Sequence, residues 1–336
     1  MLIDGEIDFG SGDFALQAGA REREGYNGVW AAETGHDPLL MLAGAATGSS
    51  RLELGTGIVV AFGRSPMITA TMANDVQLVS HGRLLLGLGS QIKPHIEKRY
   101  SMPWSRPAAR MREYILAMRA IWSSWNEETS LRFRGEFYTH TLMTPFFNPG
   151  PNPHGAPKVL LAAVGELMTE VAGEVADGLL VHPLTTERYL REVTLPALDR
   201  GLAKSGRSRE GFQISYSGLV ATGDTPEDLA IAKEAVRGQL AFYGSTPAYR
   251  GVLELHGWGE LRNQLNSLSR AGRWTDMGAL IDEEMLGTLA VVAPCDEVAL
   301  KVQRRFGDVV DRFSIYAPYV LGAEQRLRIL ADLRAL

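Results

Sequence analysis

The amino-acid sequence predicts an α/β protein built as a (β/α)8 barrel, the TIM-barrel fold. Three observations carry this prediction: strand-like and helix-like segments alternate along the chain, the strand-like segments are short and apolar, and glycines gather where several of them end. Short apolar runs are typical of parallel strands that are buried on both faces. The 336 residues, 45% of them hydrophobic and 22% charged, are enough for a large core, and barrels commonly reach this size as one domain.

Eight segments have the character of strands, and helix-like segments separate them. The predicted strands are Leu2–Asp8, Gly28–Glu33, Leu52–Ala61, Leu84–Leu88, Lys158–Val164, Asp177–His182, Phe212–Thr222 and Arg312–Ala317. Repeated βα units in this order favour a closed parallel barrel over an open sheet. We therefore expect residues 1–336 to form a single domain.

Capping residues and apolar periodicity mark the helices. Pro66 opens the helix between the third and fourth strands, and Pro107, with Ser105 as its cap, opens the next one. Thr225 and Asp228 have the spacing of a capping box. The helix that starts at Pro107 carries an apolar stripe of Met111, Ile115, Met118, Trp122 and Trp125. We interpret this stripe as core packing, with a dimer interface as the alternative.

Two segments interrupt the alternation of strands and helices. Residues 131–157 alternate in hydrophobicity with period two and then become rich in proline, which predicts a hairpin and loop inserted after the fourth helix. Residues 251–289 contain several short helix-like runs, which predict a helical cap inserted before the eighth strand. Trp258 and Trp274 belong to this cap, and we expect them to shape a substrate pocket.

The overall composition argues against several classes of protein. A net charge of −5 disfavours general nucleic-acid binding, and the single cysteine, Cys295, provides neither a disulfide frame nor a thiolate metal cluster. No run of 18 apolar residues predicts a membrane span, and the first residues, MLIDGEIDFG, do not resemble a signal peptide. We therefore expect a cytoplasmic protein that has no nucleic-acid or membrane partner and acts on a small molecule.

Glycines and polar residues gather at the predicted carboxyl ends of the strands, where barrels of this kind bind ligands. Gly55, Gly57 and Gly63 surround the end of the third strand, and Gly87 and Gly89 end the fourth. A glycine at a strand end lets another backbone or a flat ligand come close. This end of the barrel is therefore predicted to make room for a ligand.

Two further features of the same end suit an anionic ligand. Val164, Gly165 and Glu166 form a turn before a helix, whose backbone N–H groups could bind a phosphate, although most such turns bind nothing. Residues 91–112 contain six Lys or Arg residues and one acid, Glu97. This basic segment is either a solvated helix face or a rim that attracts a small anion.

Glu33 and His36, which follow the second strand, are the nearby pair of residues that could transfer protons. The alternative for His36 is a hydrogen-bonded turn residue, and His36 with Asp37 could also be metal ligands. The seven histidines are scattered, and the chain contains neither an HExxH motif nor a GxSxG motif. We therefore expect no metal site.

Three stretches of the chain resemble the bacterial luciferase-like superfamily, and within it the deazaflavin-dependent (coenzyme F420) oxidoreductases. They are GYNGVW, the strand pair LELGTGIVVAF…GRLLLGLGSQIKPHIEKRY, and AAVGELMTEVAGEVADGLL. The resemblance covers nearly the whole chain and implies a barrel that binds a flavin-like ring at the carboxyl ends of its strands. It also implies a non-prolyl cis peptide in the third strand, which maps to Gly57-Ile58.

The resemblance assigns the cofactor to residues that follow the third, fourth and fifth strands. The implied cofactor-binding residues are Gly57, Ile58, Val59, Gly89, Ser90, Gln91, Lys93, His95, Ala163, Val164, Gly165 and Glu166. The phosphate maps to Val164-Gly165-Glu166, and Lys93, His95 and Arg99 are expected to meet the acidic tail of the deazaflavin.

The sequence departs from the sugar-phosphate dehydrogenases of this family at two positions. Those enzymes place an acid and then a histidine after the second strand, whereas this chain has Glu33-Thr34, with the histidine displaced to His36; their acid after the fourth strand falls at Ile92. The resulting hypothesis is an oxidoreductase that transfers a hydride between F420 and an unidentified small organic substrate, with Glu33 or His36 handling the proton. The alternatives are an FMN-dependent monooxygenase and a cofactor-binding protein without catalysis. The resemblance and the apolar helices also suggest a homodimer or a higher homo-oligomer.

Overall fold

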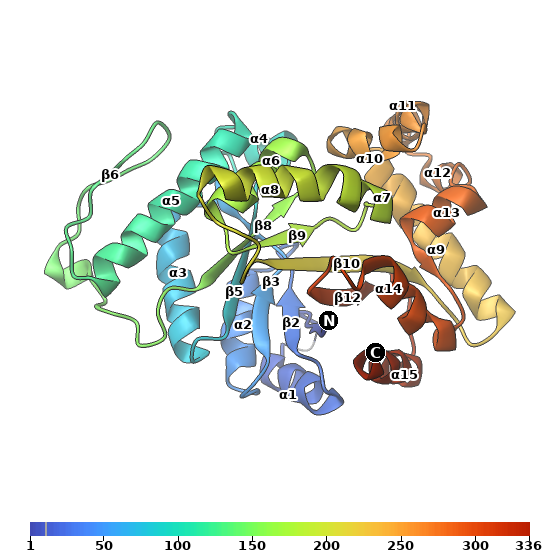
Figure 1. Cartoon of the computed structure of the whole chain (residues 1–336), viewed down its shortest axis with the longest axis horizontal. Helices are drawn as coiled ribbons and strands as arrows, with labels where there is room; N and C mark the ends of the chain where they lie inside the picture. The colour runs from blue at the N-terminus through green and yellow to red at the C-terminus, as the bar shows by residue number, and fades with distance from the viewer. Residues whose placement is uncertain (11) are drawn as a thin grey trace.

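Eight parallel strands form a closed barrel in the computed structural model, which describes residues 1–10 and 12–336 (Figure 1). The barrel strands are β1 (Leu2–Glu6), β2 (Gly28–Ala31), β3 (Glu53–Thr56), β5 (Leu84–Gly89), β8 (Lys158–Ala163), β9 (Gly178–Val181), β10 (Gln213–Ala221) and β12 (Arg312–Tyr316). Each strand pairs in parallel with the next, and the pairing of β1 with β12 closes the ring. The predicted (β/α)8 fold is confirmed.

Helices follow the strands around the outside of the barrel. They are α1 (Phe14–Glu24), α2 (Pro38–Ala46), α3 (Pro66–Val79), α4 (Lys93–Lys98), α5 (Pro107–Asn126), α6 (Glu166–Val175), α7 (Glu187–Tyr189), α8 (Leu195–Lys204), α9 (Pro226–Gly244), α14 (Val298–Phe306) and α15 (Ala323–Ala335). A π-helical segment, Leu190–Thr194, joins α7 to α8. None of the helices in the described part of the chain combines the length and the apolar character that a membrane span requires.

The third predicted strand is divided in two. The structure ends β3 at Thr56 and resumes at β4 (Val59–Val60), and both pieces pair with β5. Between them lies the cis peptide bond Gly57-Ile58, as the family resemblance implied. The break lies at the carboxyl end of β3.

Two predictions about helix caps had different outcomes. The capping box of Thr225 and Asp228 is confirmed, since each side chain bonds the other's backbone N–H. The prediction that Ser105 caps α5 is wrong, because Arg106 occupies the N-cap position, with φ of 30° and no side-chain cap. The apolar stripe of α5 packs inside the chain, where its five residues are at most 2% exposed.

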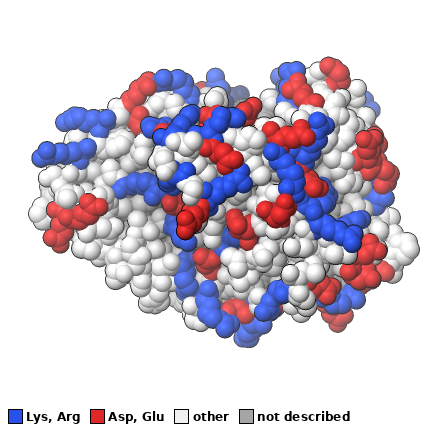
Figure 2. Space-filling model, viewed as in Figure 1, with Lys and Arg blue, Asp and Glu red and all other residues white. Residues whose placement is uncertain are grey.

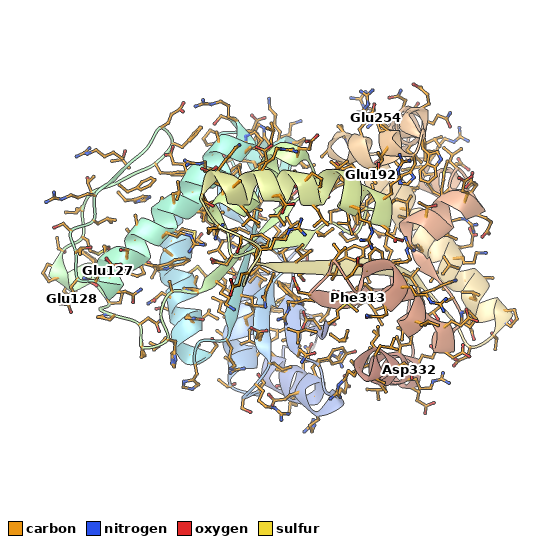
Figure 3. The ribbon with its side chains drawn as sticks, in the orientation of Figure 1. Glu127, Glu128, Glu192, Glu254, Phe313 and Asp332 are labelled. Carbon is orange, nitrogen blue, oxygen red and sulfur yellow. The ribbon has the colours of Figure 1, made fainter. Side chains whose placement is uncertain are left out.

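The two insertions lie where the sequence placed them. A hairpin of β6 (Phe133–Arg134) and β7 (Thr139–His140) follows α5 and projects from the barrel (Figure 1). The helices of the second insertion are α10 (Arg250–Leu255), α11 (Gly259–Arg270), α12 (Trp274–Gly278) and α13 (Glu283–Leu289), and the short strand β11 (Val291–Val292) follows them. These helices pack on α9 in an apolar cluster of their own. Glu254 of α10 lies at the outer edge in Figure 3, whereas Phe313 of β12 lies inside the barrel.

A buried ion pair joins the first barrel strand to the last. Arg312 on β12 donates hydrogen bonds of 2.7 and 2.8 Å to the carboxylate of Asp4 on β1, and it also pairs with Glu53. Trp30 donates its indole N–H to the same carboxylate at 2.8 Å. Arg312 and Asp4 are 0% and 2% exposed, so each charge depends on the other for its compensation.

Candidate active site

A cavity of about 1550 Å³ opens at the carboxyl ends of the barrel strands. Residues from the ends of β1, β2, β5, β8, β9, β10 and β12 line it, together with the break between β3 and β4. This is the end at which barrels of this architecture place their active sites. The cavity is therefore the candidate active site.

One wall of the cavity contains most of the residues that were predicted to bind a cofactor. The predicted residues that line it are Gly57, Ile58, Gly89, Ser90, Gln91, Ala163, Val164, Gly165 and Glu166. Gly89 has no side chain, and a Cβ added there would lie 2.6 Å from Cδ1 of Ile58. The absence of that atom lets the Ile58 side chain pack on Gly89 at the cavity lining, and we call this apolar side chain the Ile58 shelf.

Two of the strand-end glycines serve the barrel and not the cavity. A Cβ on Gly55 would lie 2.3 Å from the Trp30 ring, and a Cβ on Gly87 would lie 1.9 Å from the carbonyl oxygen of Thr56. Gly87 also exchanges hydrogen bonds of 2.8 Å with the hydroxyl of Thr56. The glycine pattern thus combines close strand packing at Gly55 and Gly87 with a close contact to the Ile58 side chain at Gly89. Gly57 is less crowded, since a Cβ there would lie 3.7 Å from the Trp30 ring.

The turn that precedes α6 presents backbone donors to the same cavity. Gly165 is the N-cap of α6 and makes no side-chain cap bond, so the first N–H groups of the helix lack a side-chain acceptor. Its φ is −88°, and nothing lies within 4 Å of a Cβ placed on it. Uncapped amides at a helix N-terminus favour an anionic group.

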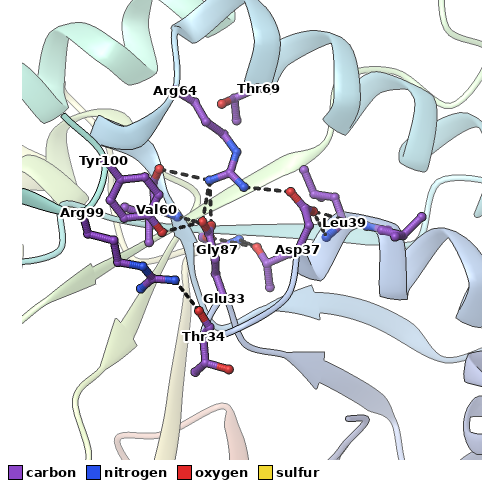
Figure 4. A network of polar contacts seen from close by, with 12 residues as sticks. Glu33, Thr34, Asp37, Leu39, Val60, Arg64, Thr69, Gly87, Arg99 and Tyr100 are labelled. Atoms are coloured by element: carbon purple, nitrogen blue, oxygen red, sulfur yellow. Dashed lines mark hydrogen bonds and ion pairs between the residues drawn. The ribbon is translucent and has the colours of Figure 1, made fainter. Parts of the chain in front are cut away.

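Glu33 lines the cavity, but its carboxylate is held from several sides (Figure 4). Arg64 donates to both of its oxygens, at 2.9 and 2.7 Å, and Tyr100 donates its hydroxyl at 2.8 Å. The backbone N–H of Val60 donates to Oε2 at 2.8 Å, which ties the carboxylate to β4. Burial, and then the nearby Glu33 carboxylate, raise the pKa of Tyr100. This arrangement fixes the segment that carries Ile58.

The remaining predicted site residues lie outside the cavity lining. His36 is exposed and stacks on Phe9, with ring centroids 3.6 Å apart. Val59 is fully buried in β4. Lys93 and His95 lie on the exposed side of α4, where Lys93 is 3.8 Å from Glu97. The structure thus brings Glu33 to the cavity and leaves His36 beside it.

Glu6 is a cavity carboxyl that the sequence interpretation did not select. It ends β1 beside Trp30 and lines the cavity, and no hydrogen bond to its carboxylate is found among the described residues. The side chain of Glu6 is exposed at the cavity, and desolvation by the surrounding protein raises its pKa, against the opposing effect of Arg21 and with a smaller contribution from Asp8. A sequence signal was present, since Glu6 lies two residues before the end of the first predicted strand, Leu2–Asp8.

Aromatic side chains form the side of the cavity beside β9 and β12. We call His182, Tyr243, Tyr249 and Tyr316 the aromatic wall; all four line the cavity. The rings of His182 and Tyr249 stack with centroids 4.1 Å apart, and Tyr243 meets His182 edge-on at 4.7 Å. Burial lowers the pKa of His182 to about 3 and raises that of Tyr249 to about 12.

The predicted cap shapes the cavity less than expected. Within the described part of the chain, no residue of the predicted cap, 251–289, lines the cavity. Tyr243, Ala248 and Tyr249, which line it on this side, precede the cap. Trp258 stacks on His256, and Trp274 is 53% exposed; neither lines the cavity.

Charged side chains occupy the rim of the cavity. The rim charges are Arg106, Arg112, Glu166, Glu170, Glu174 and Lys204. Several are paired with one another, as Arg112 is with Glu174 at 2.6 Å and Lys204 with Glu170 at 2.5 Å. Both signs of charge also intermix over the face drawn in Figure 2. Among residues 1–10 and 12–336, no group of three or more His, Cys, Asp or Glu side chains could hold a metal ion.

A closed parallel barrel with its cavity at the strand ends defines a barrel enzyme, and comparison with known proteins identifies its family. The family model of the luciferase-like monooxygenases matches residues 11–312. The chain belongs to this family and is an oxidoreductase.

Relatives and solved structures agree with this assignment. An uncharacterized protein of Mycobacterium tuberculosis is 57% identical over 93% of this chain and 92% of its own length. The 5,10-methylenetetrahydromethanopterin reductase of Archaeoglobus fulgidus is 28% identical over 84% of this chain and 82% of its own.

Two solved structures share the fold. The coenzyme F420 dependent tetrahydromethanopterin reductase from Methanopyrus kandleri has a TM-score of 0.77 and 20% identity, with 98% of this chain and 97% of that chain covered. EDTA monooxygenase from Chelativorans sp. BNC1 has a TM-score of 0.75 and 15% identity, with 100% and 94% covered.

The cavity wall fits a flat cofactor that carries a phosphate. The Ile58 shelf beside Gly89 offers an apolar surface to the cavity, and the uncapped amides at Gly165 lie on the same lining. Ile58 would support the ring, and the turn at Gly165 would hold the phosphate. A deazaflavin or flavin bound there would supply the redox chemistry.

Proposed function

We propose that this protein is an F420-dependent oxidoreductase that transfers a hydride between the deazaflavin and a small organic substrate. The observation that carries the proposal is the joint lining of one cavity by the Ile58 shelf and the uncapped N-terminus of α6. The similarity to a methylenetetrahydromethanopterin reductase and the shared fold of an F420 dependent reductase support it.

In this proposal the chain's own residues orient the cofactor and manage the proton. Glu33, held by Arg64 and Tyr100, fixes β4 and the shelf through the N–H of Val60. The carboxylate of Glu6 lines the cavity and makes no hydrogen bond or ion pair of 4.0 Å or less among the described residues, so we assign the proton to it ahead of Glu33 and His36. Desolvation favours its protonated form, which suits a group that delivers a proton.

The test is the direct binding of each cofactor to the apoprotein. Titration with F420 and with FMN, followed by fluorescence, should show F420 binding at least about tenfold more tightly. Tight binding of FMN without binding of F420 would overturn the proposal.

The second candidate is an FMN-dependent monooxygenase, and the fold shared with EDTA monooxygenase supports it. Oxygen consumption that requires reduced FMN and depends on substrate would establish it, because the deazaflavin reaction proceeds without oxygen.

Three expectations about the whole protein stay predictions. Light scattering after size exclusion tests the homo-oligomer, a single cooperative unfolding transition tests the single domain, and fractionation of the source cells tests the cytoplasmic location.

A further inference from the structure

The aromatic wall lies across the cavity from the Ile58 shelf. In the ring of strands, β9 is separated from β3 by β5 and β8 on one side, and by β10, β12, β1 and β2 on the other. His182 directly follows β9, and Tyr316 ends β12. A flat ligand on the shelf would therefore leave its outer face directed toward the aromatic wall.

The lining on this side carries no unpaired charged side chain among the described residues. Besides the aromatic wall, β9, β10 and β12 and the segments that follow them contribute Leu180, Val181, Pro183, Tyr189, Ser215, Ser217, Ala248 and Ser314. The charged residue Lys204, on α8, is paired with Glu170. The charged lining residues belong to β1, β2 and the rim helices. A substrate group with a net charge would find no counter-charge here, and burying an unpaired charge is costly.

His182 offers this side of the cavity a defined hydrogen-bond donor. Its Nδ1 accepts a hydrogen bond of 3.0 Å from the backbone N–H of Leu184. In a neutral imidazole the proton then resides on Nε2. No described residue bonds Nε2, and the ring is fixed between Tyr249 and Tyr243. The stacking holds the donor in one orientation.

Tyr316 adds a second donor close by. The hydroxyl of Tyr243 donates to the hydroxyl of Tyr316 at 3.3 Å, which leaves the hydrogen of Tyr316 available. Both donors can bind an oxygen with lone pairs, and neither supplies a positive charge that would compensate an anion.

We propose that Nε2–H of His182 binds an uncharged carbonyl or hydroxyl oxygen of the substrate, and that the aromatic wall selects uncharged substrates. This inference rests on the proposed function, since it assigns the substrate class of the same cavity. His182 is then a substrate-binding residue, and specificity follows from the missing counter-charge and from the two neutral donors.

The test observes His182 directly by NMR in protein labelled with ¹⁵N-histidine, both as apoprotein and saturated with oxidised F420. The probes are cyclohexanone, acetophenone and 2-decanone, each paired with its acid analogue: cyclohexanecarboxylate, benzoate and decanoate. At least one ketone should shift the Nε2 signal of His182 and saturate, and its acid analogue should bind at least about tenfold more weakly.

Two substitutions separate the donor from the ring. His182→Phe keeps a flat ring beside Tyr249 and removes the donor, and it should weaken binding of that ketone by about tenfold. His182→Gln keeps a side-chain N–H and should recover part of the affinity. His154→Phe is the matched control, because His154 is exposed and outside the cavity lining.

Each result decides the inference. No shift of His182 with any ketone, equal binding of an acid and its ketone, or undiminished ketone affinity in His182→Phe would overturn it. F420 affinity is measured separately, so a protein that binds ketones at His182 but not F420 would refute the proposed function and leave the substrate site standing. Circular dichroism confirms that each variant is folded.

Discussion

Nη1 of Arg64 lies 2.7 Å from Oε2 of Glu33, and the two side chains are only 15% and 7% exposed. The second arm of Arg64 reaches Asp37 at 2.8 Å. This pairing links the end of β2 to the segment after β4, and it gives the Glu33 carboxylate a structural task.

Glu33→Gln should therefore destabilise the protein. Arg64 would keep only Asp37 as a charged partner, and the free energy of unfolding should fall by about 1–3 kcal/mol in denaturant titrations. The control is Arg51→Gln, since Arg51 is 79% exposed and 3.9 Å from Glu22; it should change stability by less than about 0.5 kcal/mol. A Glu33→Gln protein as stable as the natural chain would contradict this structural role and favour Glu33 as the residue that transfers the proton.

Glu6 should titrate above the ordinary glutamate value of 4.5. Desolvation disfavours its ionised form more than the facing Arg21 favours it, while Asp8 adds to the upward shift. The carboxyl carbon of Glu6, observed by ¹³C NMR in labelled protein, reports the midpoint, and Glu6→Gln identifies the signal by removing it. A midpoint at or below 4.5 would contradict the assignment of Glu6 as proton donor.

Gly89→Ala should lower F420 affinity without unfolding the protein. The new Cβ would lie 2.6 Å from Cδ1 of Ile58, a flexible tip that can move, so the shelf shifts while the barrel stays intact. We expect the dissociation constant for F420 to rise about tenfold, which equals a loss of about 1.4 kcal/mol in binding free energy. Gly287→Ala on α13 is the control, because nothing lies within 4 Å of its Cβ and alanine favours a helix. Unchanged F420 affinity in Gly89→Ala would show that the cofactor ring does not rest on the Ile58 shelf.

Gly165→Asp should stabilise α6 and at the same time weaken the binding of F420. Aspartate is a good N-cap, and the site has room and a compatible φ of −88°. Its charge would repel a phosphate at the same amides. Gly165→Asn provides the same cap without the charge, so it should raise the melting temperature similarly and cost much less F420 affinity. Equal affinities in the two variants would place the phosphate elsewhere.

The burial of His182 should make stability depend on pH. Its pKa is about 3 in the folded protein, against the ordinary value of 6.5 in the unfolded chain. Between these values the unfolded chain binds the extra proton, so stability falls as the pH falls, by up to about 2 kcal/mol from pH 6.5 to pH 5. His182→Phe should lose this part of the pH dependence, whereas His154→Phe should keep it. Parallel curves for all three proteins would contradict the buried neutral state.

Strands and helices could be predicted from the sequence because their signals are local. Apolar runs, proline at helix starts and the Thr225 capping box depend on neighbouring residues, and each is found in the structure. The Ser105 cap failed because Arg106 takes the N-cap position in a left-handed conformation, a choice that the local sequence does not reveal.

The position of the proposed cofactor residues along one cavity was also predictable, since strand ends of one barrel meet at one face. The positions of the glycines in the sequence could not show which of them pack against other strands and which line the cavity. Gly87 serves the Thr56 backbone and Gly89 frees the Ile58 shelf, and both contacts cross between strands that are remote in sequence.

The sequence by itself thus determined the barrel, its insertions and the end of the barrel at which the cavity opens, because periodicity and chain order are sufficient for these. Only the tertiary structure decided which polar groups are free to act. Arg64, 31 positions away, binds the carboxylate of Glu33. Glu6 lines the cavity, and His182 stacks on Tyr249. Partners that fold together from distant segments set charge, burial and donor availability, and these long-range contacts leave no local pattern.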